Sequence, residues 1–93
     1  MQLPDNWKPQ HHKACSWTTL DDETVVVHAQ QGTVSVLNGL GGRVWSLCDG
    51  SLDLETLTER LCEEFDAPAD QVRQETGAFL ADMISRGLVY PPT

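Results

Sequence analysis

The sequence predicts an α+β fold in which a three-stranded antiparallel sheet is followed by three helices. Up to Leu37, β-branched and aromatic residues fill short runs that turn-forming residues separate, which is typical of strands. Beyond Gly50, apolar residues recur every three or four positions, which is typical of helices. The glycine-rich stretch 37–50 joins the two halves. A chain of 93 residues has room for one hydrophobic core, so we expect a single domain.

Three β-like runs are separated by Asp21-Asp22 and by Gln30-Gln31-Gly32, so an antiparallel meander is the simplest interpretation. In the third run, Val34 and Val36 share one face and the residues between them share the other. One face can therefore cover a core while the other is semi-polar. The runs are 15–20, 23–28 and 33–37.

Three helices follow. The first covers 39–48, with Asn38 as its expected cap, and the second covers 54–65, with Ser51 or Asp53 as its cap. The second ends before Pro68, because proline disfavours helical geometry in the residue that precedes it.

The third helix begins near Ala69 or Asp70 and ends at Gly87, a C-terminal cap. Gly77 lies in its middle, where glycine costs about 1 kcal/mol relative to alanine. Close approach of another backbone would justify that cost. Residues 88–90 are expected to return as a short strand or a tail over the core.

Residues 1–13 contain two prolines and no periodic pattern, so we expect a flexible N-terminal arm ahead of a single domain at 14–93. Trp7 is the exception in this arm, and we expect it to pack against its own domain.

Charge and targeting signals narrow the function classes. The formal net charge is −8, and most of it comes from residues 51–93, which hold nine acids against three arginines. Nucleic-acid binding rests largely on Lys and Arg neutralising phosphates, so this balance argues against a nucleic-acid partner. The sequence has no apolar run of bilayer length and no signal-peptide pattern, so we expect no membrane partner and a cytoplasmic location.

The sequence shows no catalytic or cofactor motif. Three cysteines without a Cys-x-x-Cys spacing make a disulfide framework unexpected, and Cys48 and Cys62 fit core thiols. His11, His12 and Cys15 lie close together, but their spacing matches no closed zinc site. We therefore predict no metal, no cofactor and no catalysis by this chain alone.

A set of residues spread over the central stretch and the last helix matches a known pattern. The run Leu-Asn-x-x-Gly-x-x-Val-Trp-x-Leu-x-Asp-Gly starts at Leu37, and Phe79-Leu80 and Gly87-Leu88-Val89 follow it. Over roughly residues 15–90 the chain resembles the PqqD-like family. These proteins are the peptide chaperones of pyrroloquinoline quinone biosynthesis and the related recognition elements for ribosomally made, modified peptides.

The resemblance implies a winged helix-turn-helix-like arrangement that binds the leader segment of a precursor peptide as an added strand. The third strand and the third helix would form the two walls of the site, with Arg86 on its border. The peptide-binding residues carried over by position are Thr33, Val34, Ser35, Val36, Leu37, Val72, Glu75, Thr76, Phe79 and Met83. The alternative is that the apolar members on the helix are simply core residues. The motif residues expected to be structural are Val44, Trp45, Leu47, Asp49 and Gly50.

The leading hypothesis is thus a non-catalytic binding module that presents a leader peptide to a modifying enzyme, such as a radical S-adenosylmethionine enzyme or a leader peptidase. Two alternatives remain open at this stage: a winged-helix DNA-binding regulator, and an acidic protein-interaction domain. The protein is expected to be a monomer or a dimer formed through the free strand edge.

Overall fold

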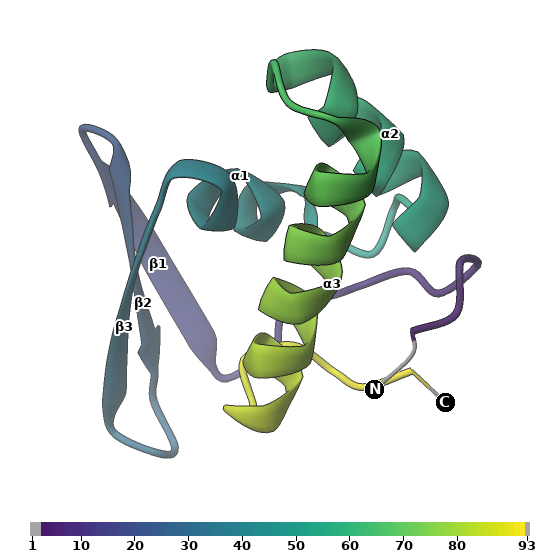
Figure 1. The fold of residues 1–93 in the computed structure, drawn as a ribbon. Coiled ribbons are helices and arrows are strands. Elements are labelled where there is room, and N and C mark those ends of the chain that lie inside the picture. Colours follow the sequence, from purple (N-terminus) through teal and green to yellow (C-terminus); the bar gives the residue numbers. More distant parts are fainter. Residues whose placement is uncertain (1–2, 93) are drawn as a thin grey trace.

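A computed structural model describes residues 3–92 and shows a three-stranded sheet followed by three helices (Figure 1). The strands are β1 (Cys15–Leu20), β2 (Glu23–His28) and β3 (Thr33–Asn38), in the spatial order β1-β2-β3 with both pairs antiparallel. The predicted strands and the α+β class are confirmed, and β3 is one residue longer than expected. The winged-helix likeness stays a prediction.

The helices are α1 (Gly39–Leu47), α2 (Leu54–Glu64) and α3 (Ala69–Ser85). Asp53 caps α2, since its side chain accepts a hydrogen bond from the Thr56 N–H at 2.8 Å. Asn38 stands at the N-cap of α1 without a side-chain cap bond. Gly87 follows α3 at φ +75°, the left-handed conformation expected of a C-terminal glycine.

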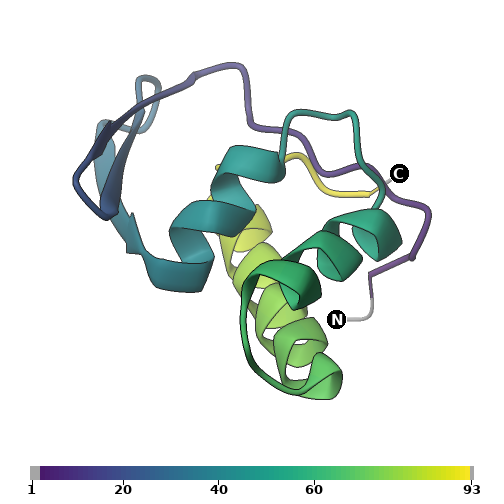
Figure 2. The same cartoon turned by 90° about the horizontal axis from the view of Figure 1, so that it is seen from above.

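All three helices lie on one face of the sheet (Figure 2). The residues that this face buries on β2 and β3 are Thr24, Val26, His28, Ser35 and Leu37. Trp45 of α1 is fully buried and packs in one core cluster with Val26, Leu37 and Met83. A second cluster, around Leu57 and Leu61, fills the space between the helices.

The opposite face of the sheet carries exposed apolar side chains. Val27 and Val34 form one cross-strand pair, Val25 and Val36 form the next, and Val34 and Val36 are 65% and 57% exposed. In β3, the face that carries Ser35 and Leu37 therefore points toward the core, and the face that carries the two valines points to solvent. Sequence periodicity separates the two faces of a strand but does not say which one is covered.

The N-terminal segment is part of the packed domain, which corrects the expectation of a flexible arm for residues 3–13. The N–H of His11 donates to the carbonyl of Cys48 at 3.0 Å, and the N–H of Leu54 donates to the carbonyl of Trp7 at 2.7 Å. His11 also forms an isolated antiparallel bridge with Val89. Leu88 and Val89 are buried, so of the two alternatives predicted for residues 88–90 the structure shows the tail over the core and not a further strand. Trp7 is half-buried against both core clusters, as predicted.

Gly77 is not explained by close packing. A Cβ atom at this position would meet no atom within 4 Å, so close approach of a neighbouring helix, one of the explanations that the sequence left open, does not account for the glycine. Over residues 3–92, no helix has the length and apolar character needed to cross a membrane.

Candidate functional site

The free edge of β3 is the first element of the candidate site. Within residues 3–92, β3 pairs with β2 along one side and with no strand along the other. Successive residues of an antiparallel edge strand point their backbone groups alternately toward the partner and away from it. About half of the N–H and C=O groups of β3 therefore face outward, which is a template for an extended peptide.

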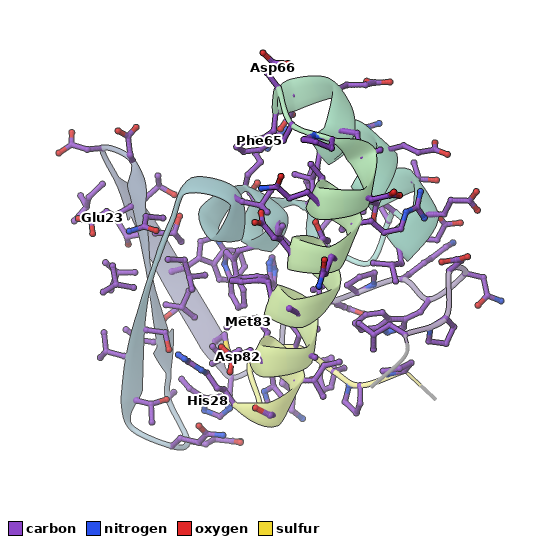
Figure 3. The ribbon with its side chains drawn as sticks, viewed as in Figure 1. Glu23, His28, Phe65, Asp66, Asp82 and Met83 are labelled. Carbon is purple, nitrogen blue, oxygen red and sulfur yellow. The ribbon has the colours of Figure 1, made fainter. Side chains whose placement is uncertain are left out.

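The second element is the flank of α3 that faces this edge. Glu75, Phe79, Asp82 and Arg86 recur at spacings of four, three and four residues, so they share one side of the helix. Phe79 is half-buried and touches both core clusters, while the three charged residues are exposed. Figure 3 shows Asp82 on the side of α3 toward the sheet. We call the space between the β3 edge and this flank the β3–α3 groove.

One end of the groove is a defined hollow of about 300 Å³ beside the β2–β3 turn. Arg86 lines it from the end of α3, and the residues opposite are Gln31, Thr33, Val34 and Ser35. The Arg86 Nε atom lies 3.2 Å from Asp82 Oδ2, an ion pair whose two side chains are about half exposed. The turn and the helix end are in close contact here, because a Cβ on Gly87 would lie 2.6 Å from Gln31 Nε2.

The groove is closed at depth by α1. A Cβ on Gly41 would lie 2.9 Å from Phe79 Cε2, so the phenyl ring lies against bare backbone. Only glycine allows a ring this close to the first turn of α1. The motif glycine of the sequence therefore sets the position of a groove side chain.

The structure separates the predicted peptide-binding residues into two groups. Thr33, Val34, Val36, Glu75 and Phe79 are exposed or half-buried. Val72, Thr76 and Met83 are 2%, 0% and 1% exposed and are core residues, as are Ser35 and Leu37 at 9% and 7%. Of the four positions on the third helix that were expected either to bind peptide or to belong to the core, three are therefore core positions. Of these buried residues only Ser35 lines the hollow at the end of the groove, and the others belong to the core beneath it.

Sequence reasoning missed Asp82 and Gln31 and placed Arg86 only at the border. Asp82 and Arg86 follow Phe79 at helical spacing, and that spacing is the signal that could have found them. Gln31 sits in a turn whose position against the end of α3 no local pattern specifies.

The motif residues expected to be structural lie away from the groove lining. Val44, Trp45 and Leu47 are buried. Asp49 accepts from the N–H and the hydroxyl of Ser51, and these bonds lower the pKa of its carboxyl. Gly50 has φ +83°, so it makes the turn that starts the connection to α2.

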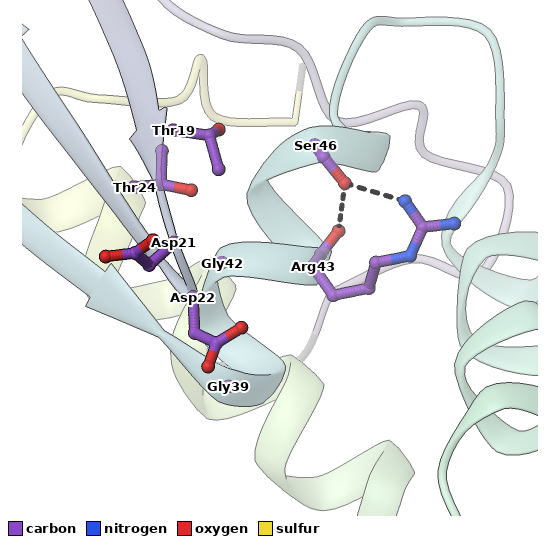
Figure 4. A pocket seen from close by; sticks show the side chains of 8 residues that line it. All are labelled: Thr19, Asp21, Asp22, Thr24, Gly39, Gly42, Arg43 and Ser46. Carbon is purple, nitrogen blue, oxygen red and sulfur yellow. Dashed lines mark hydrogen bonds between the residues drawn. The ribbon is translucent and has the colours of Figure 1, made fainter.

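A second hollow, of about 210 Å³, lies at the other end of the sheet beside α1 (Figure 4). Its lining includes Asp21, Asp22 and Arg43. Arg43 Nε and Nη2 donate to the Glu64 carboxylate at 2.7 and 2.6 Å, which lowers the pKa of Glu64 and ties α1 to the end of α2. The guanidinium is thus engaged within the protein.

The histidines and cysteines form no metal centre. Within residues 3–92 no group of three or more potential ligands is close enough to hold an ion. The His11 ring lies 4.2 Å from both Trp17 and Trp45, and burial lowers its pKa. Burial raises the pKa of the Cys48 thiol to about 12, so Cys48 is an inert core thiol. Cys62 is only half-buried, at the edge of the helical cluster.

Two known structures resemble this one over most of their length. TbiB1, solved in complex with the TbiA(beta) leader peptide, is 27% identical, with a TM-score of 0.81 over 87% of this chain and 94% of that one. Lasso peptide synthetase B1, complexed with the leader peptide, is 13% identical, with a TM-score of 0.80 over 90% of this chain and 99% of that one. The second likeness supports the fold alone.

A search of curated proteins finds no significant match. The family model for coenzyme PQQ synthesis protein D (PqqD) matches residues 23–89, from the start of β2 to the buried tail after α3. This match covers well over half of the chain and includes both walls of the β3–α3 groove. The protein therefore belongs to the PqqD family.

Proposed function

We propose that this protein is a non-catalytic module that captures the leader segment of a ribosomally made precursor peptide in the β3–α3 groove. The peptide adds to the sheet as a fourth strand beside β3, and the module presents it to a modifying enzyme. The observation that carries the proposal is the free edge of β3 beside a helix flank that holds a half-buried phenyl ring.

The two walls supply different parts of recognition. Backbone hydrogen bonds to β3 bind any extended peptide, because they do not depend on side chains. Phe79 and the hollow at Arg86 face the peptide's side chains and supply selectivity. This division suits a protein that holds a peptide without cutting or altering it.

The solved relatives support the same function. TbiB1, which is 27% identical to this chain over most of its length, was solved with a leader peptide. The chain also belongs to the PqqD family. The receiving enzyme that we propose is a radical S-adenosylmethionine enzyme or a leader peptidase, and the proposed location is the cytoplasm.

The DNA-binding alternative finds no support in α3. The helix carries three acids, Asp70, Glu75 and Asp82, against Arg73 and the arginine at its C-cap, Arg86. A recognition helix needs an excess of positive charge to approach phosphates. A salt-dependent shift of duplex DNA by the protein would revive this alternative.

The test of the function is a calorimetric titration with synthetic peptides that match short precursor reading frames adjacent to the gene. Saturable binding by one of them is the expected result. No binding up to the millimolar range by any such peptide would contradict the proposal. A matched pair of variants locates the site: Phe79→Leu, in the groove, should weaken binding, whereas Arg73→Gln, exposed on α3 away from the groove, should not.

A further inference from the structure

Arg86 gives the hollow at the end of the groove a positive lining. The other residues that line it are neutral, and three of them carry polar side chains: Gln31, Thr33 and Ser35. The chain as a whole has a net charge of −8. A cationic hollow in so acidic a protein is a local feature that general surface composition does not explain.

The ion pair with Asp82 leaves most of the Arg86 guanidinium unused. The contact is between Nε and Oδ2 at 3.2 Å, and both side chains are about half exposed. A guanidinium has five N–H donors, so the two terminal nitrogens remain for a second carboxylate. An exposed pair one helical turn apart is weak, so it does not compete strongly with a bidentate partner.

Neutral groups around Arg86 match the same ligand. The Gln31 amide and the Thr33 hydroxyl are on the facing turn, and Thr33 Oγ1 lies 3.4 Å from Gln31 Oε1. The Thr33 hydroxyl donates to Gln31 Oε1 in this bond, so the N–H groups of the Gln31 amide are the neutral donors left for a carboxylate that enters the hollow. No acidic residue is among those that line it.

The geometry of a strand adds a rule of register. Alternate side chains of an added strand point to the same face, so those that face α3 are separated by an even number of residues. In a peptide added beside β3, one of these side chains would meet Phe79 and another would meet Arg86.

We propose that the hollow receives an aspartate or glutamate side chain of the bound peptide, with Arg86 as its cation. The module then selects peptides that carry an acid at an even number of residues from an apolar side chain. This inference rests on the proposed function and specifies the ligand of the same groove.

The test is a selection from a display library of random 12-residue peptides against three proteins: the wild type, Arg86→Glu and Arg73→Glu. Wild-type selections should be enriched in Asp or Glu at an even separation from an apolar residue. Peptides selected by Arg86→Glu should carry Lys or Arg in place of that acid. Arg73→Glu reverses the charge of an exposed arginine outside the groove, and peptides selected by it should still carry the acid. An unchanged preference in Arg86→Glu would overturn the inference.

Affinities of one selected peptide complete the test. Arg86→Gln should weaken binding about tenfold, as loss of a charge-assisted pair does, and amidation of the peptide's acid should cost the same. When Arg86→Gln meets the amidated peptide, the loss of affinity should be no larger than for either change alone. Asp82→Asn should strengthen binding, because it removes the carboxylate that competes for Arg86. Additive losses would contradict the inference, and thermal unfolding of each variant checks that it remains folded.

Hydrogen exchange of the β3 amides separates failure of this inference from failure of the function. If the selected peptides protect β3 but ignore the charge at position 86, the inference alone is wrong. If no peptide is enriched, or none protects β3, the proposed function is wrong as well.

Discussion

The phenyl ring of Phe79 on α3 lies against the bare backbone of Gly41 on α1, where an added Cβ would come within 2.9 Å of Cε2. Gly41 belongs to the motif that identifies the family, and Phe79 faces the groove. The contact therefore links this motif position of α1 to the shape of the candidate site. No other residue type at position 41 leaves the ring where it is.

Gly41→Ala should lower stability and weaken peptide binding together. Overpacking typically costs about 1–3 kcal/mol, and the gain in helix propensity returns about 1 kcal/mol, so we expect a net loss of up to about 2 kcal/mol. Denaturant unfolding and peptide titration measure the two effects. The control is Gly42→Ala, whose Cβ would lie an ordinary 3.5 Å from Thr24 Oγ1 and should not destabilise. If Gly41→Ala and Gly42→Ala had the same stability and the same peptide affinity, the proposed role of the contact between Gly41 and Phe79 would be contradicted.

The sequence predicted the framework of the groove but not its lining. Strand and helix limits were predictable because turn residues mark them: Asp21-Asp22, Gly32, Asp49-Gly50 and Pro68 stand at the junctions. The apolar stripe of α3 includes both core and groove positions. Val72, Thr76 and Met83 could not be separated from Phe79 by periodicity, because the sheet's position relative to the helix decides which flank is covered.

The N-terminal segment was mispredicted for a related reason. Residues 3–13 have no periodic pattern because they form neither helix nor strand. Their backbone is satisfied by distant carbonyl and N–H groups, such as the carbonyl of Leu88, which accepts from the N–H of His12 at 2.9 Å. Such pairings depend on tertiary structure and leave no local signature.

Gly77→Ala should stabilise the protein by about 1 kcal/mol, because a Cβ there meets nothing within 4 Å and alanine is the better helix former. For a domain of this size, that gain raises the thermal midpoint by about 4–8 °C. Position 77 lies off the groove flank of α3, so peptide affinity should not change. A lower midpoint would mean that the position is more crowded than the structure shows.

The half-buried His11 ring should make the protein less stable in mild acid. Burial lowers its folded-state pKa below the usual 6.5, although the carbonyl of Trp45 and the charge of Asp49 act in the opposite direction. Below pH 6.5 the unfolded chain binds a proton that the folded chain resists, so stability is lost as pH falls from about 6.5 toward the folded-state pKa.

Urea midpoints at pH 7.5, 6.5 and 5.5 measure this effect. The wild type should lose stability over this range, and His11→Gln should lose less. Parallel pH dependence in the two proteins would show that His11 is not the group responsible.

The Arg43–Glu64 pair should contribute little at neutral pH. Both side chains are more than a third exposed, so solvent screens the pair despite its two-pronged geometry, and Glu64→Gln should cost at most about 1 kcal/mol. High salt should reduce the difference. The Arg43 side chain lowers the pKa of the Glu64 carboxyl in the folded state. The stabilisation from the ion pair is therefore fully present at pH values above the ordinary pKa of a glutamate, and it is lost as pH falls through the lowered, folded-state pKa. If the difference in unfolding free energy between the wild type and Glu64→Gln did not change with salt, this account would be contradicted.

The central claim, that a peptide joins the sheet beside β3, is tested most directly by amide hydrogen exchange with and without a bound precursor peptide. In the described part of the chain, residues 3–92, the sheet has two edges, β1 and β3, and of these two β3 faces the groove. We predict that the peptide slows exchange at alternate amides of β3, those that face outward, and leaves the outward amides of β1 unchanged. Saturating peptide that protects β1, or that leaves the β3 amides as they are in the free protein, would contradict the account.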